Sequence, residues 1–184
     1  MNSLVGRKIS TNLQFDRQRS TLIMKFMPQL KSSNAAEFLC PPFQDDRGAF
    51  INLICLKQEA FNQYWGDRQI RQVNLSTNSK KGTLRGLHFQ RGQFSEAKIV
   101  RCLRGRVFDV IIDLRAESAG YLKVKHFVID ATEANSVFVP EGHAHGFQTL
   151  EADSEVLYIH SKDRNIEAET GLRWNDPELA ITWP

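Results

Sequence analysis

Residues 98–114 read KIVRCLRGRVFDVIIDL, two apolar runs on either side of Arg104 and Gly105. One face of the second run would consist of Phe108, Val110, Ile112 and Leu114. A period of two residues is typical of a β-strand, and a glycine between two such runs indicates a tight turn. The stretch therefore predicts a β-hairpin, with two apolar strands joined at Arg104-Gly105.

Short runs of this kind recur along most of the chain, separated by glycine, proline and aspartate. The segments that we expect to form strands are residues 50–56, 70–76, 82–90, 122–129, 136–139, 142–150 and 155–160. Only residues 58–66 favour a helix, which is short and ends at a glycine. Many short strands with almost no helix predict an all-β protein built as a double-sheet antiparallel barrel. We therefore expect a double-stranded β-helix or jelly roll of the cupin type, with few short helices.

The length of 184 residues favours one domain. Residues 1–23 are polar and lack apolar periodicity, so we expect a disordered N-terminal arm followed by a single domain over residues 24–184. The formal net charge of +3 is too small and too dispersed to indicate nucleic-acid binding, but it is compatible with a pocket for a phosphorylated small molecule.

Neither a membrane span nor a disulfide framework is indicated. No apolar run approaches the roughly 20 residues that a membrane-spanning helix needs. The three cysteines are an odd number at unrelated spacings, which argues against paired disulfides and against a CxxC metal site. We therefore expect a cytoplasmic protein that does not bind membranes.

Residues 82–90 read GTLRGLHFQ and place a histidine, His88, in an apolar segment. On a regular strand Arg85 would share a face with Leu87 and Phe89, and His88 would point the other way, toward small or polar neighbours. Histidine titrates near neutral pH, so it can take a proton from a weak carbon acid if a carboxylate holds its tautomer. The alternative is a hydrogen-bonded strand histidine without a chemical role.

Four stretches, in this order, resemble one family: residues 82–90, 97–113 (AKIVRCLRGRVFDVIID), 139–150 (VPEGHAHGFQTL) and 171–184 (GLRWNDPELAITWP). Together they resemble the dTDP-4-dehydrorhamnose 3,5-epimerases, which invert carbons flanking the ketone of nucleotide-linked 4-keto-6-deoxy sugars. The resemblance runs from Phe43 to the C-terminus. It implies a cupin fold, an isomerase of deoxysugar and polysaccharide biosynthesis (including lipopolysaccharide), a nucleotide-sugar substrate and no cofactor. It also implies a homodimer whose N-terminal strands exchange.

The resemblance assigns roles to eight residues. His88 is implied to be the base, Asp176 the carboxylate that orients it, and Lys98 a cation near the keto oxygen, where a fixed positive charge favours the enolate. The implied substrate-binding residues are Arg47, Gln72, Asn74, Arg85 and His145. Arg47 would reach a phosphate, because its planar guanidinium bonds two phosphate oxygens at once.

Five of these residues have a plain structural explanation as well. Arg47 fits a surface turn in which it pairs with Asp45 or Asp46. Asp176 fits a turn that precedes Pro177. Gln72 and Asn74 fit the polar face of a sheet, and Lys98, too, fits a strand end where its ammonium reaches solvent.

One element of the family pattern is missing. The double epimerases carry an acid tyrosine in a Thr-Asp-Tyr-Tyr-like element, and the aligned residues here are Lys162, Asp163 and Arg164. Between two cations the carboxyl group of Asp163 is favoured as an anion, which does not suit an acid. Tyr158 lies in the preceding strand and is expected in the core. Inversion of one carbon, a related activity on another nucleotide sugar and an inactive relative all remain open.

Three further alternatives belong to other classes. His143 and His145 have the i, i+2 spacing that places two imidazoles on one strand face, so a metal-dependent cupin is possible with a third ligand from His88, His126 or His160. A nucleotide-sugar 3,4-ketoisomerase shares the fold and acts on the same substrates. A nucleotide-sugar binding protein without turnover is the third. The sequence does not identify the nucleotide or the sugar.

Overall fold

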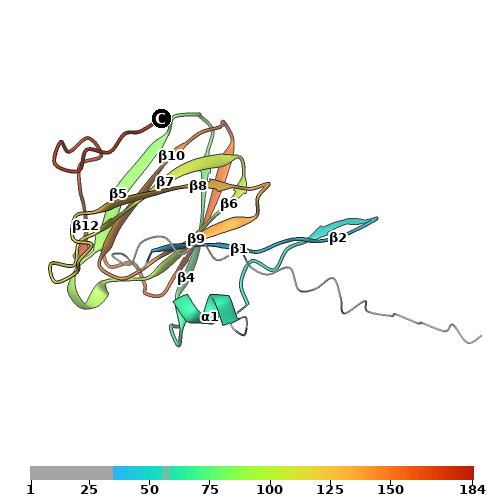
Figure 1. Ribbon diagram of the computed structural model, residues 1–184, viewed down its shortest axis with the longest axis horizontal. Coiled ribbons are helices and arrows are strands. Elements are labelled where there is room, and N and C mark those ends of the chain that lie inside the picture. The colour runs from blue at the N-terminus through green and yellow to red at the C-terminus, as the bar shows by residue number, and fades with distance from the viewer. Residues whose placement is uncertain (1–34, 56, 58) are drawn as a thin grey trace, which may run out of the picture.

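The computed structural model describes residues 35–55, 57 and 59–184, and this part of the chain is almost entirely β-structure. Two five-stranded antiparallel sheets face each other across a common core (Figure 1). The first sheet has the order β1 (Ala36–Leu39), β9 (Asn135–Val139), β6 (Lys98–Arg104), β11 (Ser154–His160) and β4 (Gln72–Asn78). The second has the order β12 (Glu169–Gly171), β5 (Leu84–Gln90), β10 (His143–Thr149), β7 (Arg106–Asp113) and β8 (Val124–Asp130). The predicted all-β jelly roll of the cupin type is confirmed. The predicted N-terminal arm, residues 1–23, lies outside the described residues.

The core between the sheets takes alternate residues from both. Val100 of β6 and Val156 of β11 pack from the first sheet, and Val107 and Ile111 of β7 pack from the second, all essentially without solvent exposure. Burial of such side chains contributes roughly 1.5–3 kcal/mol each relative to exposure. The same alternation determines which polar residues of these strands also point inward.

The outer faces of both sheets are covered as well. Helix α1 (Glu59–Trp65), predicted as residues 58–66, is confirmed and packs Phe61 and Trp65 on the first sheet. The C-terminal segment places Leu179, Ile181 and Trp183 on the second sheet. Because strands β6 and β7 are covered on both faces, each carries apolar residues on both of its sides. No helix in the described part of the chain is long and apolar enough to cross a membrane.

The predicted hairpin at residues 98–114 is wrong in its pairing. Both strands form, but β6 pairs with β9 and β11 in the first sheet, whereas β7 pairs with β8 and β10 in the second. Gly105 therefore carries the chain from one sheet to the other, with φ +73. Alternation determines which side of a strand is buried, but it contains no information about which strand lies beside it.

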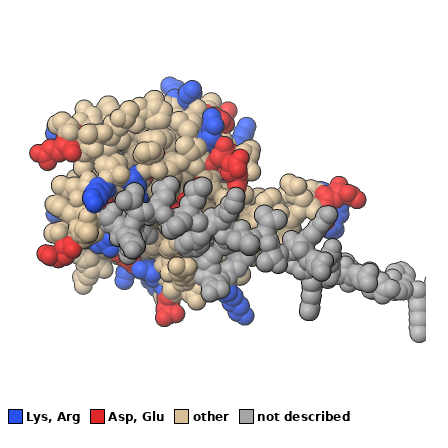
Figure 2. Space-filling view, in the orientation of Figure 1, with Lys and Arg blue, Asp and Glu red and all other residues tan. Residues whose placement is uncertain are grey.

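The predicted strand at residues 50–56 is also wrong. The turn at Asp45–Gly48 closes a short hairpin of β2 (Phe43–Asp45) and β3 (Gly48–Phe50), so the second strand begins two residues earlier and ends at Phe50. Residues 51–55 are not extended in a ladder. This hairpin projects away from the barrel (Figure 1), and its tip carries acidic and basic side chains together (Figure 2).

Candidate functional site

A cavity of about 270 Å³ opens between the two sheets and is lined from both. The first sheet contributes Gln72, Asn74, Ser76, Lys98, Tyr158 and His160. The second contributes Arg85, His88, Phe89, Gln90, His145, Phe147 and Glu169. Strands that are far apart in the sequence therefore bring six of the eight predicted site residues together: His88, Lys98, Gln72, Asn74, Arg85 and His145.

Arg85 and His88 both line the cavity, although an odd separation on a regular strand would place them on opposite faces. The register explains this. His145 of β10 lies opposite His88 and Phe147 lies opposite Arg85, so three steps along β5 match two steps along β10. This extra residue is a β-bulge, which re-aims the side chains on one side of it. The prediction that Arg85 faces away from His88 is therefore wrong.

Glycines make the bulge possible. Gly86 has φ +129, a conformation that side chains rarely adopt, and it lies against Gly146 of β10. A Cβ on Gly86 would lie 2.5 Å from the Cα of Gly146, and one on Gly146 would lie 2.7 Å from the carbonyl oxygen of Arg85. Only a pair of glycines allows the two backbones to approach this closely.

His88 lies at the mouth of the cavity with its ring partly exposed. The pKa of His88 is lowered, first because the ring loses hydration against the cavity wall and then because the ammonium of Lys98 disfavours a second positive charge. Glu169 opposes this shift in part. The imidazole is therefore held in its neutral form, which is the form that accepts a proton.

His145 is buried and faces the cavity from the second sheet. Its Nε2 atom lies 2.6 Å from Oδ2 of Asp109, which is itself fully buried. Burial raises the pKa of Asp109, while the neighbouring imidazole lowers it in part. The ring of His145 is thereby fixed in orientation, which suits a group that binds substrate.

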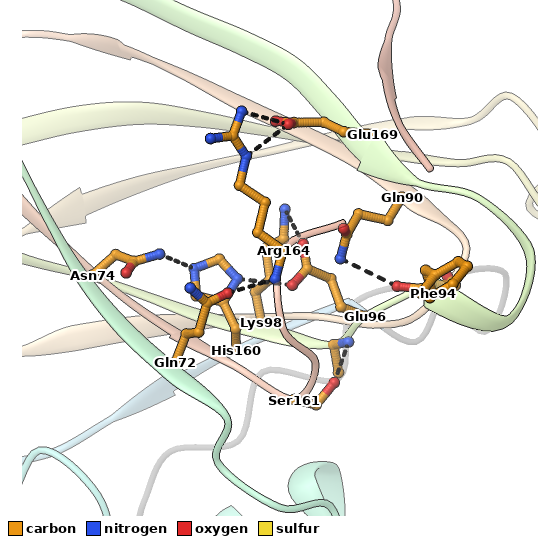
Figure 3. A network of polar contacts seen from close by, with 12 residues as sticks. Gln72, Asn74, Gln90, Phe94, Glu96, Lys98, His160, Ser161, Arg164 and Glu169 are labelled. Carbon is orange, nitrogen blue, oxygen red and sulfur yellow. Dashed lines mark hydrogen bonds and ion pairs between the residues drawn. The ribbon is translucent and has the colours of Figure 1, made fainter. Parts of the chain in front are cut away.

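A network on the opposite wall was not predicted from the sequence (Figure 3). Oε1 of Glu96 lies 3.1 Å from Nζ of Lys98, and its Oε2 lies 2.9 Å from Nδ1 of His160. The amide nitrogen of Asn74 lies 3.2 Å from Nε2 of the same ring. The signal in the sequence was the alternation of β11, because His160 is two residues beyond Tyr158 and must face the same way.

Polar contacts also fix the rim of the cavity. The side-chain oxygen of Gln72 accepts a hydrogen bond from the backbone of Arg164 (2.7 Å), and the Arg164 guanidinium pairs with Glu169 at 2.6 Å (Figure 3). Gln90 accepts a hydrogen bond from the backbone of Asn165 at 2.5 Å. These contacts tie residues 161–169 to both sheets at the cavity mouth.

Two predicted site residues do not line the cavity. Arg47 is at the tip of the β2–β3 hairpin, with its side chain 89% exposed, and pairs with Asp45 at 2.5 Å. The carboxylate of Asp176 accepts a hydrogen bond from the backbone of Glu178 (3.1 Å) and lies 3.7 Å from the Arg173 guanidinium. Both therefore make the local turn contacts that were the alternatives, and their functional roles stay predictions.

A family model described as dTDP-4-dehydrorhamnose 3,5-epimerase matches residues 30–184. The chain belongs to the dTDP-4-dehydrorhamnose 3,5-epimerase family. It is 38% identical over 142 residues to the enzyme of that name from Sinorhizobium fredii, a match that covers 77% of this chain and 72% of the relative. The crystal structure of the Bacillus anthracis dTDP-4-dehydrorhamnose 3,5-epimerase, with TDP and PPi bound, superposes with a TM-score of 0.80 at 32% identity, over 88% of this chain and 90% of that one.

Single-carbon enzymes are also among the similar structures. A double mutant of ChmJ, a 3'-monoepimerase from Streptomyces bikiniensis in complex with dTDP, superposes with a TM-score of 0.77 at 27% identity, over 86% of this chain and 78% of that one. The predictions that this chain is an isomerase of the epimerase type and has the fold of that family are confirmed.

Asp163, which aligns with the family tyrosine, and the nearby Tyr158 differ in their position relative to the cavity. Asp163 is exposed, pairs with Arg71 at 2.7 Å and does not line the cavity. Tyr158 packs against the core, as expected, but it also forms part of the cavity wall. Burial raises the pKa of the Tyr158 phenol well above its usual value. Asp163 is therefore remote from the cavity, and the raised pKa makes the Tyr158 phenol a weaker proton donor.

The metal alternative depends on His143 and His145. Each imidazole has a carboxylate of β7 near it: Asp109 for His145, and Asp113, at 3.9 Å, for His143. Within residues 35–55, 57 and 59–184, no group of three or more histidine, cysteine, aspartate or glutamate side chains is arranged to hold a metal ion. The third ligand that this alternative needs therefore has no candidate in the described part of the chain.

Proposed function

We propose that the chain epimerises a nucleotide-diphosphate-linked 4-keto-6-deoxy sugar, with His88 as the base. His88 would take a proton from a carbon next to the ketone, and the ammonium of Lys98 would stabilise the enolate oxygen that forms. A proton delivered to the opposite face of that carbon then inverts it. Gln72, Asn74, Arg85 and His145 would bind the sugar and its diphosphate.

One observation carries this proposal: a neutral imidazole and an ammonium face one cavity from opposite sheets. The charge of Lys98 contributes to the lowered pKa of His88, so the two groups act on each other across the space where the sugar would lie. A base and a cation so arranged suit proton removal next to a carbonyl. Similar structures hold TDP or dTDP, which supports a thymidine nucleotide as the carrier.

Asp176 is proposed as the carboxylate that orients His88. In support, Gly171 of β12 lies opposite His88, so the segment that carries Asp176 starts beside the base. This carboxylate accepts a hydrogen bond within its own turn, and a shift of that turn would free it. Replacing it by asparagine is expected to lower the rate without weakening nucleotide binding.

We further propose a homodimer in the cytoplasm in which each β2–β3 hairpin reaches the partner's barrel. The hairpin projects away from its own barrel, and Phe43 and Phe50 are 65% and 70% exposed on it. Apolar side chains on a projecting hairpin favour contact with a second subunit. Arg47, on the same hairpin, would then meet the diphosphate in the partner's cavity.

The test is hydrogen exchange in deuterated water with a dTDP-linked 4-keto-6-deoxy sugar, followed by NMR at each ring carbon. We expect deuterium at one or both carbons next to the ketone, and an inverted sugar as the product. His88→Asn should abolish both. Exchange in His88→Asn at the unmutated rate would remove the base assignment. A 3-keto product would identify a ketoisomerase, and binding without exchange would identify a non-catalytic protein.

A further inference from the structure

We propose that His160, held by Glu96, is the acid that returns a proton to the sugar carbon from the face opposite His88, in place of the missing family tyrosine. This inference rests on the proposed epimerase function. It assigns a second acid–base group to a residue pair that the sequence motifs do not single out.

The contacts of His160 are those of an oriented catalytic imidazole. Its Nδ1 atom lies 2.9 Å from the Glu96 carboxylate, and the two side chains are only 13% and 8% exposed. A carboxylate at Nδ1 fixes the tautomer and the ring plane, and it favours the imidazolium when the ring takes up a proton. Nε2 is then the atom that would carry the transferred proton, and in the structure it contacts the amide nitrogen of Asn74, which also lines the cavity.

Glu96 is an anion in this setting. Burial opposes its ionisation, but the hydrogen bond from His160 and the nearby charge of Lys98 outweigh burial and lower the pKa of Glu96 below its usual value. One carboxylate thus holds both the ammonium proposed for the enolate oxygen and the imidazole proposed as the acid. Lys98 and His160 are also direct partners in the ladder between β6 and β11.

The position of His160 is opposite to that of His88. His88 projects from β5 of the second sheet and His160 from β11 of the first, and both line the same cavity. A sugar ring between the sheets would present one face to each imidazole. Removal of a proton on one side and delivery on the other is the requirement for inversion.

The proton transfers balance. His88 accepts the proton from carbon as the enolate forms, and the imidazolium of His160 then donates its Nε2 proton to the same carbon as the enolate returns to the ketone. Solvent afterwards removes the proton from His88 and restores the one on His160. In the structure Nε2 faces the amide nitrogen of Asn74 at 3.2 Å, as in a neutral ring. The acid form requires the Asn74 amide to move away from Nε2, so that the Nε2 proton can point at the substrate carbon.

Other donors fit less well. The phenol of Tyr158 has a raised pKa and its ring packs against Phe147 and His145, with centroid distances of 6.4 and 6.2 Å. Asp163 lies outside the cavity, in an ion pair with Arg71. Among the described residues of the first sheet that line the cavity, His160 is the one imidazole, and it is held by a carboxylate.

The experiment measures deuterium exchange and inversion separately in His160→Gln. Without the second acid, His88 can still remove a proton and return a deuteron to the same face. We therefore expect exchange within a few-fold of the unmutated rate, while inverted product falls by about 100-fold or more. Glu96→Gln should also lower the rate of inversion more than the rate of exchange, but by a smaller factor than His160→Gln. His126→Gln is the matched control, because His126 is exposed on the outer face of β8, stacked on Phe108.

Three results would overturn the proposal and leave the base assignment of His88 intact. Inversion at the unmutated rate in His160→Gln is the first. The second is loss of inversion in Tyr158→Phe with His160→Gln unaffected. The third is equal loss of exchange and inversion in His160→Gln, since a purely structural histidine predicts that pattern. Failure of the epimerase function itself would appear differently, as absence of exchange in the unmutated protein.

Discussion

Gly86 and Gly146 lie back to back in neighbouring strands, so close that a Cβ on Gly86 would come within 2.5 Å of the Gly146 Cα. This approach occurs at the bulge in β5, between the residue pairs Arg85–Phe147 and His88–His145. The contact between two backbones therefore sets the direction of both Arg85 and His88. Any side chain at either glycine must separate the strands that carry the site.

Gly146→Ala is expected to destabilise the fold by about 3 kcal/mol, because the new methyl group meets a carbonyl oxygen that cannot move aside. Gly92→Ala is the control: nothing lies within 4 Å of its would-be Cβ, so only its left-handed conformation, φ +60, costs free energy, about 1 kcal/mol. Urea unfolding of both variants gives the comparison. Equal losses would show that the close approach does not limit the strand pairing.

The sequence predicted most strands of this fold but not their partners. Alternation separated the two faces of β7 correctly, but the face of Phe108, Val110, Ile112 and Leu114 packs beneath the C-terminal segment, and Val107 and Ile111 point into the core between the sheets. The neighbour of β6 depends on long-range contacts, and the turn at Gly105 fits a hairpin and a crossover between sheets equally well. The local sequence pattern does not distinguish a hairpin from a crossover between the two sheets.

The site was predictable to the extent that each side chain lies on a regular strand. Lys98 and His145 face the cavity as alternation requires. Arg85 faces it only because of the bulge in β5, and the residue types of this segment do not predict a bulge. Glu96 and His160 are 64 residues apart. Their pairing arises from the register of β11 beside β6, which the sequence does not reveal.

Lys98→Met is expected to slow epimerisation by about 100-fold or more, because the enolate oxygen loses its cation. The same change should move the acid limb of the pH–rate profile upward. A base works only when neutral, so rate falls as pH drops through its pKa, and the charge of Lys98 is one cause that lowers the pKa of His88. Without that charge, His88 becomes protonated at a higher pH.

Kinetic profiles of kcat/KM from pH 4.5 to 9 would measure both effects of Lys98→Met. The exposed Lys123 provides the control, since Lys123→Met removes the same charge away from the cavity. An acid limb that stays in place in Lys98→Met would contradict the electrostatic coupling between Lys98 and His88.

Asp163→Asn is expected to leave both exchange and inversion within about two-fold of the unmutated rates. Its carboxylate pairs with Arg71 in the open, and an exposed ion pair of this kind contributes only about 0–1 kcal/mol to stability. The side chain occupies the aligned place of the family tyrosine without reaching the cavity. A loss of inversion of ten-fold or more would instead make Asp163 a participant in proton delivery.

Arg47→Ala is expected to weaken nucleotide-sugar binding, seen as a KM about ten-fold higher, if the guanidinium meets the diphosphate. Whether it acts on its own barrel or on the partner's can be decided by mixing two inactive or impaired chains. Co-expressing Arg47→Ala with His88→Asn, each with a different affinity tag, isolates the mixed dimer by two-step purification.

The number of complete sites in the mixed dimer distinguishes the two arrangements. If each hairpin serves the partner's cavity, the Arg47→Ala chain keeps its own His88 and receives an intact Arg47 from its partner. One site is then complete, and the dimer should show about half the unmutated kcat with an unmutated KM. If Arg47 serves its own barrel, one site lacks the base and the other lacks the arginine, so the high KM of Arg47→Ala persists. That outcome would contradict exchange of the β2–β3 hairpin, because the projecting hairpin would have to fold back onto its own barrel to reach substrate.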